Sequence, residues 1–177
     1  MTMKMLEAGG VPLLTDGVRP ADSSNPLGYF EYEPVRHLAT GTNPVWLRAA
    51  RGKAVKIISF LLAYLPEDYD FRVIFLQRDL AEVLASQQKL LEERDAHGAA
   101  ATDDTMSVQM YEDHLQQVER LLAGRRCFTV LPLNYRAVLE SPLVASRRIA
   151  DFIGKPLNVK KMASVVNPAL YRNRDQR

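Results

Sequence analysis

Two apolar runs in the second half of the chain predict buried β-strands. Residues 73–76 and 127–133 are almost continuously apolar, as expected for parallel strands that are covered on both faces. Two shorter segments, residues 11–14 and 54–58, repeat this pattern. Each of the four segments leads into turn or helix signals, so all four are candidate strands.

Apolar residues at helical spacing lie between these segments. One stripe covers residues 80–91, and a second runs from residue 106 to residue 122. A third helix is predicted over residues 143–153, because Ser141 and Pro142 precede it and Gly154 follows it. Strands that alternate with helices predict a doubly wound α/β fold with a mainly parallel sheet.

The connections and the ends of the chain are more polar. Residues 16–34 contain many Gly, Pro, Asp and Asn residues and predict a long loop, and residues 95–104 predict a surface connection. Residues 168–177 are polar and basic, as in a flexible tail. We expect one domain, because 177 residues are enough for a single sizeable core.

Composition narrows the functional classes. A formal charge of +2 is too small to indicate a nucleic-acid partner. The sequence contains neither a membrane-spanning apolar stretch nor a secretory signal, so we expect a cytoplasmic protein. The lone Cys127 lies in an apolar run, which predicts a buried, inert thiol rather than a nucleophile.

The junction after residues 73–76 carries the clearest candidate chemistry. Arg78 and Asp79 follow the strand, and Glu82 stands three residues after Asp79 in capping-box spacing. A helix that starts at the carboxyl edge of a sheet favours anions, and Arg78 suits a phosphate. Ser86 lies two turns along the same helix face. The alternative is that Arg78 merely pairs with a surface carboxylate.

Taken together, these segments resemble the sulfotransferases that use 3′-phosphoadenosine 5′-phosphosulfate (PAPS), over about residues 1–174. The most specific likeness is the strand from Phe128 to Tyr135, followed by residues 138–142 and a helix that contains residues 148–154. The resemblance implies a P-loop nucleotide-kinase-like fold with three α/β/α layers. It also implies transfer of a sulfuryl group from PAPS to a hydroxyl or amine of a small-molecule or glycan-like acceptor, without a metal.

The resemblance implies specific cofactor-binding residues. Arg78 and Ser86 correspond to the ligands of the 3′-phosphate, and Tyr135 corresponds to the tyrosine that touches the adenine. Arg172 and Arg174 lie where the family has a C-terminal basic loop that grips the 3′-phosphate. The alternatives are a packing role for Tyr135 at the start of a helix and a solvated basic tail for the two arginines.

The resemblance also implies catalytic residues. Lys56 corresponds to the catalytic lysine, and a lysine inside an apolar strand is unusual unless its head reaches water at a sheet edge. Ile58 occupies the position where cytosolic members of the family carry the histidine that acts as the base. Other branches use a loop glutamate, so Glu31, or else Glu33, becomes the candidate base; the alternative is a solvated carboxylate. His114 lies on an apolar helix face and is expected to be a satisfied core or groove residue.

One feature of the sulfotransferase family has no counterpart in this sequence. The Gly-rich phosphosulfate loop is absent, and residues 1–10 resemble the end of the helix that should follow it, so the first strand of the fold is expected to be missing. Either the chain is truncated relative to its relatives, or the sheet closes differently. The alternatives to an active enzyme are a non-catalytic or interaction protein of the same fold, including a homo-oligomer completed by another chain's strand, and a small-molecule kinase.

Overall fold

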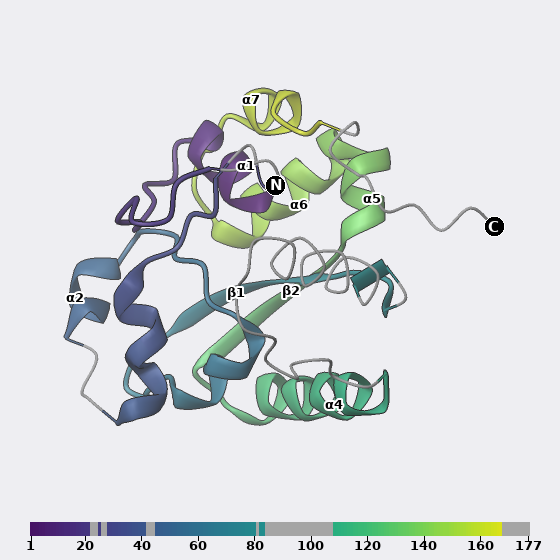
Figure 1. Ribbon diagram of the computed structural model, residues 1–177. Coiled ribbons are helices and arrows are strands. Elements are labelled where there is room, and N and C mark those ends of the chain that lie inside the picture. Colours follow the sequence, from purple (N-terminus) through teal and green to yellow (C-terminus); the bar gives the residue numbers. More distant parts are fainter. Residues whose placement is uncertain (22–24, 26–27, 42–44, 81, 84–107, 168–177) are drawn as a thin grey trace, which may run out of the picture.

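The computed structural model describes residues 1–177 except 22–24, 26–27, 42–44, 81, 84–107 and 168–177. Helices predominate in this part of the chain, and η denotes a 3₁₀ helix (Figure 1). The elements are α1 (Thr2–Gly9), η1 (Glu33–Thr40), α2 (Trp46–Ala50), η2 (Ser59–Tyr64), β1 (Phe71–Gln77), α4 (Val108–Gly124), β2 (Phe128–Asn134), α5 (Tyr135–Glu140), α6 (Pro142–Ile153) and α7 (Val159–Ser164).

The two strands form a parallel pair. The pairing runs in register from Phe71 with Phe128 to Gln77 with Asn134, so the carboxyl ends of β1 and β2 lie side by side. The predicted strands at residues 73–76 and 127–133 are therefore confirmed, and so is their parallel arrangement. The described residues form a mixed α/β structure with this two-stranded sheet.

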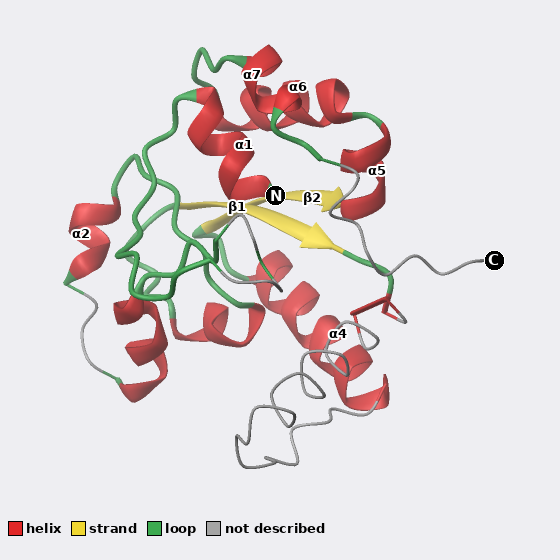
Figure 2. Cartoon of the chain, turned by 45° about the horizontal axis from the view of Figure 1, so that its top comes forward, coloured by secondary structure: helices red, strands yellow, loops and turns green. Residues whose placement is uncertain are grey.

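Apolar clusters cover both faces of the strand pair. Phe71, Val73 and Phe75 pack against one cluster, which includes residues of η1, η2 and α4. Ile74 packs against the other, which includes residues of α1, α5, α6 and α7. Successive side chains of a strand point to opposite faces, so this alternation places α4 on one side and α1, α6 and α7 on the other (Figures 1 and 2). Apolar packing against both faces explains the continuous apolar runs.

The other two candidate strands do not form. Residues 11–14 and 54–58 meet only at an isolated parallel bridge between Leu13 and Ala54. In the second segment, Val55 and Ile57 pack against the core, whereas Ile58 is 55% exposed. This apolar pattern therefore reflects burial of alternate side chains without continuous strand pairing, and the prediction of strands here was wrong.

The predicted helices agree with the observed ones in the part of the chain that the structure describes. α6 follows Ser141 and ends at Gly154, whose left-handed φ of 69° stops the helix. α4 covers the predicted second stripe from Val108 onward. The helix predicted over residues 80–91 is described only at its start, where the Val83 amide donates to the Asp79 carbonyl. Its remainder, the connection at 95–104 and the tail lie outside the described residues.

Three further findings concern the core and the helices. Cys127 is a free thiol with 7% of its surface exposed, as predicted for a buried cysteine. α1 packs on α7 so closely that a Cβ at Gly9 would lie 2.8 Å from the side chain of Met162. Within the described ranges, no helix combines the length and apolar character needed to cross a membrane.

Candidate functional site

Two predicted cofactor ligands meet at the carboxyl edge of the sheet. Arg78 directly follows β1, and Tyr135 directly follows β2, which is the parallel neighbour of β1. The guanidinium carbon of Arg78 lies 5.1 Å from the centre of the Tyr135 ring, within the range of a cation–π contact. The strand register thus brings a cation and an aromatic ring together from two separate segments.

Arg78 also pairs with an acid from the following helical turn. Its Nε lies 3.0 Å from Oε2 of Glu82, a residue with only 7% of its surface exposed. The Asp79 side chain accepts a hydrogen bond from the Glu82 amide, as the capping-box spacing predicted. Arg78 therefore pairs with a carboxylate, which is the alternative to phosphate binding given above, although the acid is buried rather than at the surface.

Tyr135 is half-buried within this group. Burial raises the pKa of its phenol, the Glu82 carboxylate raises this pKa further, and the Arg78 guanidinium opposes both effects. The phenol is thus favoured in its neutral form, which keeps its hydroxyl proton and can donate a hydrogen bond.

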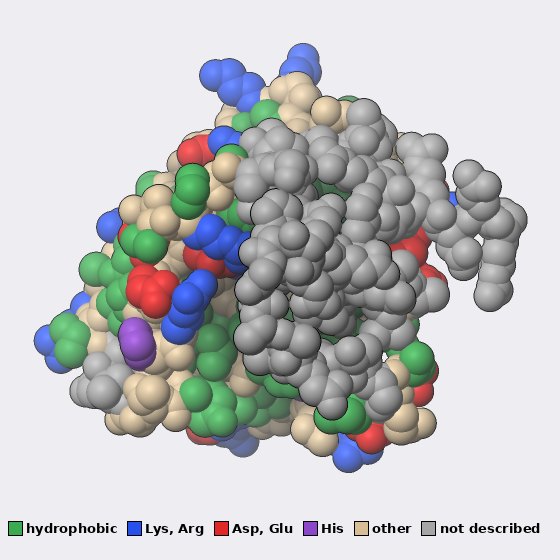
Figure 3. Space-filling model, in the orientation of Figure 1, with side chains coloured by type: hydrophobic (Ala, Val, Ile, Leu, Met, Phe, Trp, Pro, Cys, Tyr) green, Lys and Arg blue, Asp and Glu red, His purple; other side chains and the backbone are tan. Residues whose placement is uncertain are grey.

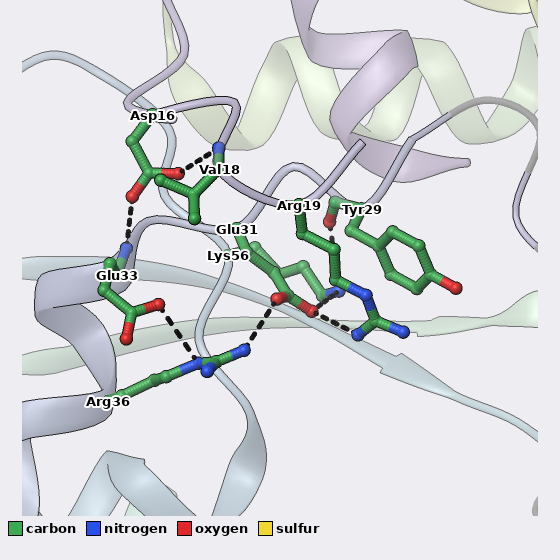
Figure 4. A network of polar contacts seen from close by, with 8 residues as sticks. All are labelled: Asp16, Val18, Arg19, Tyr29, Glu31, Glu33, Arg36 and Lys56. Atoms are coloured by element: carbon green, nitrogen blue, oxygen red, sulfur yellow. Dashed lines mark hydrogen bonds and ion pairs between the residues drawn. The ribbon is translucent and has the colours of Figure 1, made fainter. Parts of the chain in front are cut away.

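The two predicted catalytic residues also lie together (Figure 4). The Lys56 ammonium lies 3.6 Å from Oε1 of Glu31 and donates a hydrogen bond of 3.1 Å to the Tyr29 carbonyl. Because residues 55–58 are irregular, Lys56 is not the interior residue of a strand, and 37% of its side chain is exposed. Its head reaches both water and the loop that carries Glu31.

Two further members of this group, Arg19 and Arg36, were not predicted from the sequence. Arg19 Nη1 lies 3.3 Å from Oε1 of Glu31, and Arg36 Nη2 lies 3.3 Å from Oε2. Arg36 also pairs with Glu33 at 3.4 Å, so the second candidate base contacts the same arginine. The only signal in the sequence was the position of Arg19 within a polar loop and of Arg36 just after it, and this does not predict that the two arginines converge on one carboxylate.

Asp16 holds this loop in shape. Its carboxylate accepts hydrogen bonds from the backbone amides of Glu33 and Val18, and these two bonds lower the pKa of Asp16. The bond to Glu33 joins the two ends of the predicted loop at residues 16–34 (Figure 4). The loop is therefore closed by a charge-assisted hydrogen bond beside Glu31.

His114 forms a separate contact between α4 and η2. Its Nε2 lies 2.8 Å from the Ser59 hydroxyl, and the Phe60 ring stacks on the imidazole with centroids 3.6 Å apart. Burial lowers the pKa of His114. These contacts agree with the expectation that His114 is a satisfied residue of the core or of a groove.

The remaining predicted ligands, Ser86, Arg172 and Arg174, lie outside the described residues. In the part of the chain that is described, no three His, Cys, Asp or Glu side chains come close enough together to hold a metal ion. Comparisons of the sequence with family models and curated proteins, and of the fold with solved structures, found no match to this chain.

Proposed function

We propose that this chain is a sulfotransferase-like protein of the three-layer P-loop type that transfers a sulfuryl group from PAPS to a hydroxyl or amine. The observation that carries the proposal is the meeting of Arg78 and Tyr135 at the carboxyl edge of β1 and β2. Ligands of open α/β sheets bind outside the carboxyl ends of their strands. A guanidinium beside an aromatic ring suits a nucleotide that presents a phosphate next to its base.

In this proposal, the nucleotide is held by its 3′-phosphate and its adenine. Arg78 contributes charge and paired donors to the phosphate, with Ser86, Arg172 and Arg174 as further ligands, and Tyr135 packs against the adenine. The phosphate must compete with Glu82 for Arg78, because Glu82 already accepts from Nε of Arg78. Nucleotide binding therefore requires the guanidinium to share its donors between the two anions.

The transfer step requires a cation and a base. The acceptor oxygen or nitrogen bonds to the sulfur while the bond from sulfur to the bridging oxygen breaks. Lys56 stabilises the negative charge that develops on that oxygen, and Glu31 takes the proton of the acceptor. The separation of 3.6 Å between Lys56 and Glu31 supports their action in one site.

A second candidate is a non-catalytic protein of the same fold. It is favoured by the pairing of both key cations with acids of the chain itself, Arg78 with Glu82 and Lys56 with Glu31. In such a protein these ion pairs would be structural, and no nucleotide would need to displace them.

Reverse transfer distinguishes the two candidates. The protein is mixed with p-nitrophenyl sulfate and adenosine 3′,5′-bisphosphate, and transfer of the sulfuryl group to the 5′-phosphate releases coloured p-nitrophenolate. We expect Lys56→Met to lower this rate by about 100-fold, because it removes the cation at the bridging oxygen. Lys53→Met, a change at an exposed lysine three residues earlier, should leave the rate unchanged. Release by folded wild-type protein that does not exceed release by Lys56→Met would favour the non-catalytic candidate.

A further inference from the structure

Three cations converge on one carboxylate in this molecule. Oε1 of Glu31 faces Arg19 at 3.3 Å and Lys56 at 3.6 Å, and Oε2 faces Arg36 at 3.3 Å. The three basic residues come from separate parts of the chain: the loop at residues 16–34, helix η1 and the segment before η2 (Figure 4). A carboxylate that meets three cations is arranged like an anion in a binding site rather than like one half of a simple ion pair.

Each cation is also held by a contact that does not involve Glu31. The guanidinium carbon of Arg19 lies 3.3 Å from the centre of the Tyr29 ring. Lys56 donates to the Tyr29 carbonyl, and Arg36 pairs with Glu33. The three positive groups therefore do not depend on Glu31 alone for their positions, and the site is preorganised.

Glu31 also decides the charge balance of this group. The three cations are matched in number by Glu31, Glu33 and Asp16, whose carboxylate interacts with Arg36, and neutralising Glu31 would leave one net positive charge. The group is open to water, because between 37% and 60% of each basic side chain is exposed. Basic and acidic side chains lie side by side on the face of the molecule seen in Figure 3.

We propose that Arg19, Arg36 and Lys56 form a binding site for a sulfate or phosphate group, and that the Glu31 carboxylate occupies this site when no ligand is bound. The ligand is either a free inorganic ion or the end group of an ester. Tetrahedral oxyanions carry several acceptor oxygens, which match donors that approach from three directions. Lys56 and Glu31 are shared with the proposed transfer reaction, but anion binding here requires neither PAPS nor catalysis.

The test is a titration of the full chain with sodium sulfate at constant ionic strength, followed by NMR of the arginine Nε–H groups. Glu31→Gln removes the competing charge and should bind sulfate about tenfold more tightly than the wild type, because a unit charge within 4 Å contributes on the order of 1 kcal/mol or more. Sulfate should shift the Arg19 and Arg36 signals in the wild type and in Glu31→Gln. The double variant Glu31→Gln with Arg19→Gln should lose the tenfold gain.

Glu67→Gln is the matched control. It also removes one carboxylate that pairs with an arginine, Arg125, but Glu67 does not belong to the Glu31 group. Its sulfate affinity should equal that of the wild type. The proposal is overturned if Glu31→Gln binds sulfate no more tightly than the wild type, if Glu67→Gln shows the same gain, or if the gain survives Arg19→Gln. Should Glu31→Gln fail to fold, the absence of sulfate-induced shifts at Arg19 and Arg36 in the wild type would also overturn it.

A parallel titration with phenyl sulfate identifies the source of the anion. Affinity equal to that of inorganic sulfate would support a site for the free ion, and tighter binding of the ester would support a site for the end group of a larger ligand. Because neither titration contains the nucleotide, the result is independent of whether Arg78 binds adenosine 3′,5′-bisphosphate.

Discussion

At the scale of single residues, the Arg78–Glu82 ion pair is more deeply buried than the charged group around Glu31. Glu82 is 7% exposed and pairs with Arg78, whereas the Glu31 side chain is 27% exposed and shares three cations. Exposed ion pairs contribute about 0–1 kcal/mol, but removing one partner of a buried pair costs about 3–5 kcal/mol. Substitution of Arg78 therefore removes a charge partner of a buried acid, and any binding measurement on such a variant must include a measurement of its stability.

The stability of the protein is expected to depend on pH through His114. Its pKa is lowered in the folded protein because burial penalises the imidazolium form, so the native state favours the neutral ring. The associated stability is fully present above the unfolded pKa of about 6.5 and is lost as the pH falls below it. We expect the midpoint of thermal unfolding to fall more between pH 7.5 and pH 5.5 in the wild type than in His114→Gln.

The matched control for this prediction is His37→Gln, which replaces an exposed histidine. It should keep the pH dependence of the wild type. An equal loss of thermal stability in the wild type and in His114→Gln over this pH range would contradict a role for the buried imidazole.

At the scale of elements, Arg72 connects the sheet to a helix. Its Nη1 donates to the carbonyls of Phe152 and Ile153 at the C-terminal end of α6, and the distance to Phe152 is 2.8 Å. The last carbonyls of a helix lack partners within the helix and carry partial negative charge, so a cation is favourable there. An arginine of β1 thus stabilises the end of a helix that lies far away in the sequence.

Removal of this contact should destabilise the fold. We expect Arg72→Met to lower the free energy of unfolding by about 1 kcal/mol, because it removes charge-assisted hydrogen bonds at an exposed position. Urea denaturation measures the change. Arg147→Met, at an exposed position of α6 itself, should change the free energy by less than about half as much. Equal effects of the two substitutions would contradict the capping role of Arg72.

At the scale of the whole molecule, the sequence predicts those features that depend on local pattern and burial. β1 and β2 were predictable because apolar clusters pack against both of their faces, and α6 because Pro142 and Gly154 mark its ends. The meeting of Arg78 and Tyr135 then follows from parallel pairing, since each residue directly follows its strand. Two continuous apolar strands and the residues that follow them are therefore enough to bring Arg78 and Tyr135 together.

Other features depend on contacts that the sequence does not encode locally. Residues 54–58 have the composition of a strand, yet their neighbour at Leu13 pairs with them only at Ala54. Likewise, Arg19 and Arg36 reach Glu31 beside a loop that Asp16 closes onto the Glu33 amide. Such convergence arises from the conformation of a long loop, which periodicity does not predict.

The central claim is that the carboxyl edge of β1 and β2 binds an adenine nucleotide through its 3′-phosphate. The most direct test is a calorimetric titration of the full chain with adenosine 3′,5′-bisphosphate. We expect saturable binding that weakens at least tenfold in Arg78→Ala. Binding should be unchanged in Arg136→Ala, which removes an exposed arginine that follows Tyr135 and pairs with Glu140. Thermal unfolding of each variant, measured alongside, shows whether it remains folded. No binding by the folded wild type, or equal weakening in both folded variants, would contradict the account.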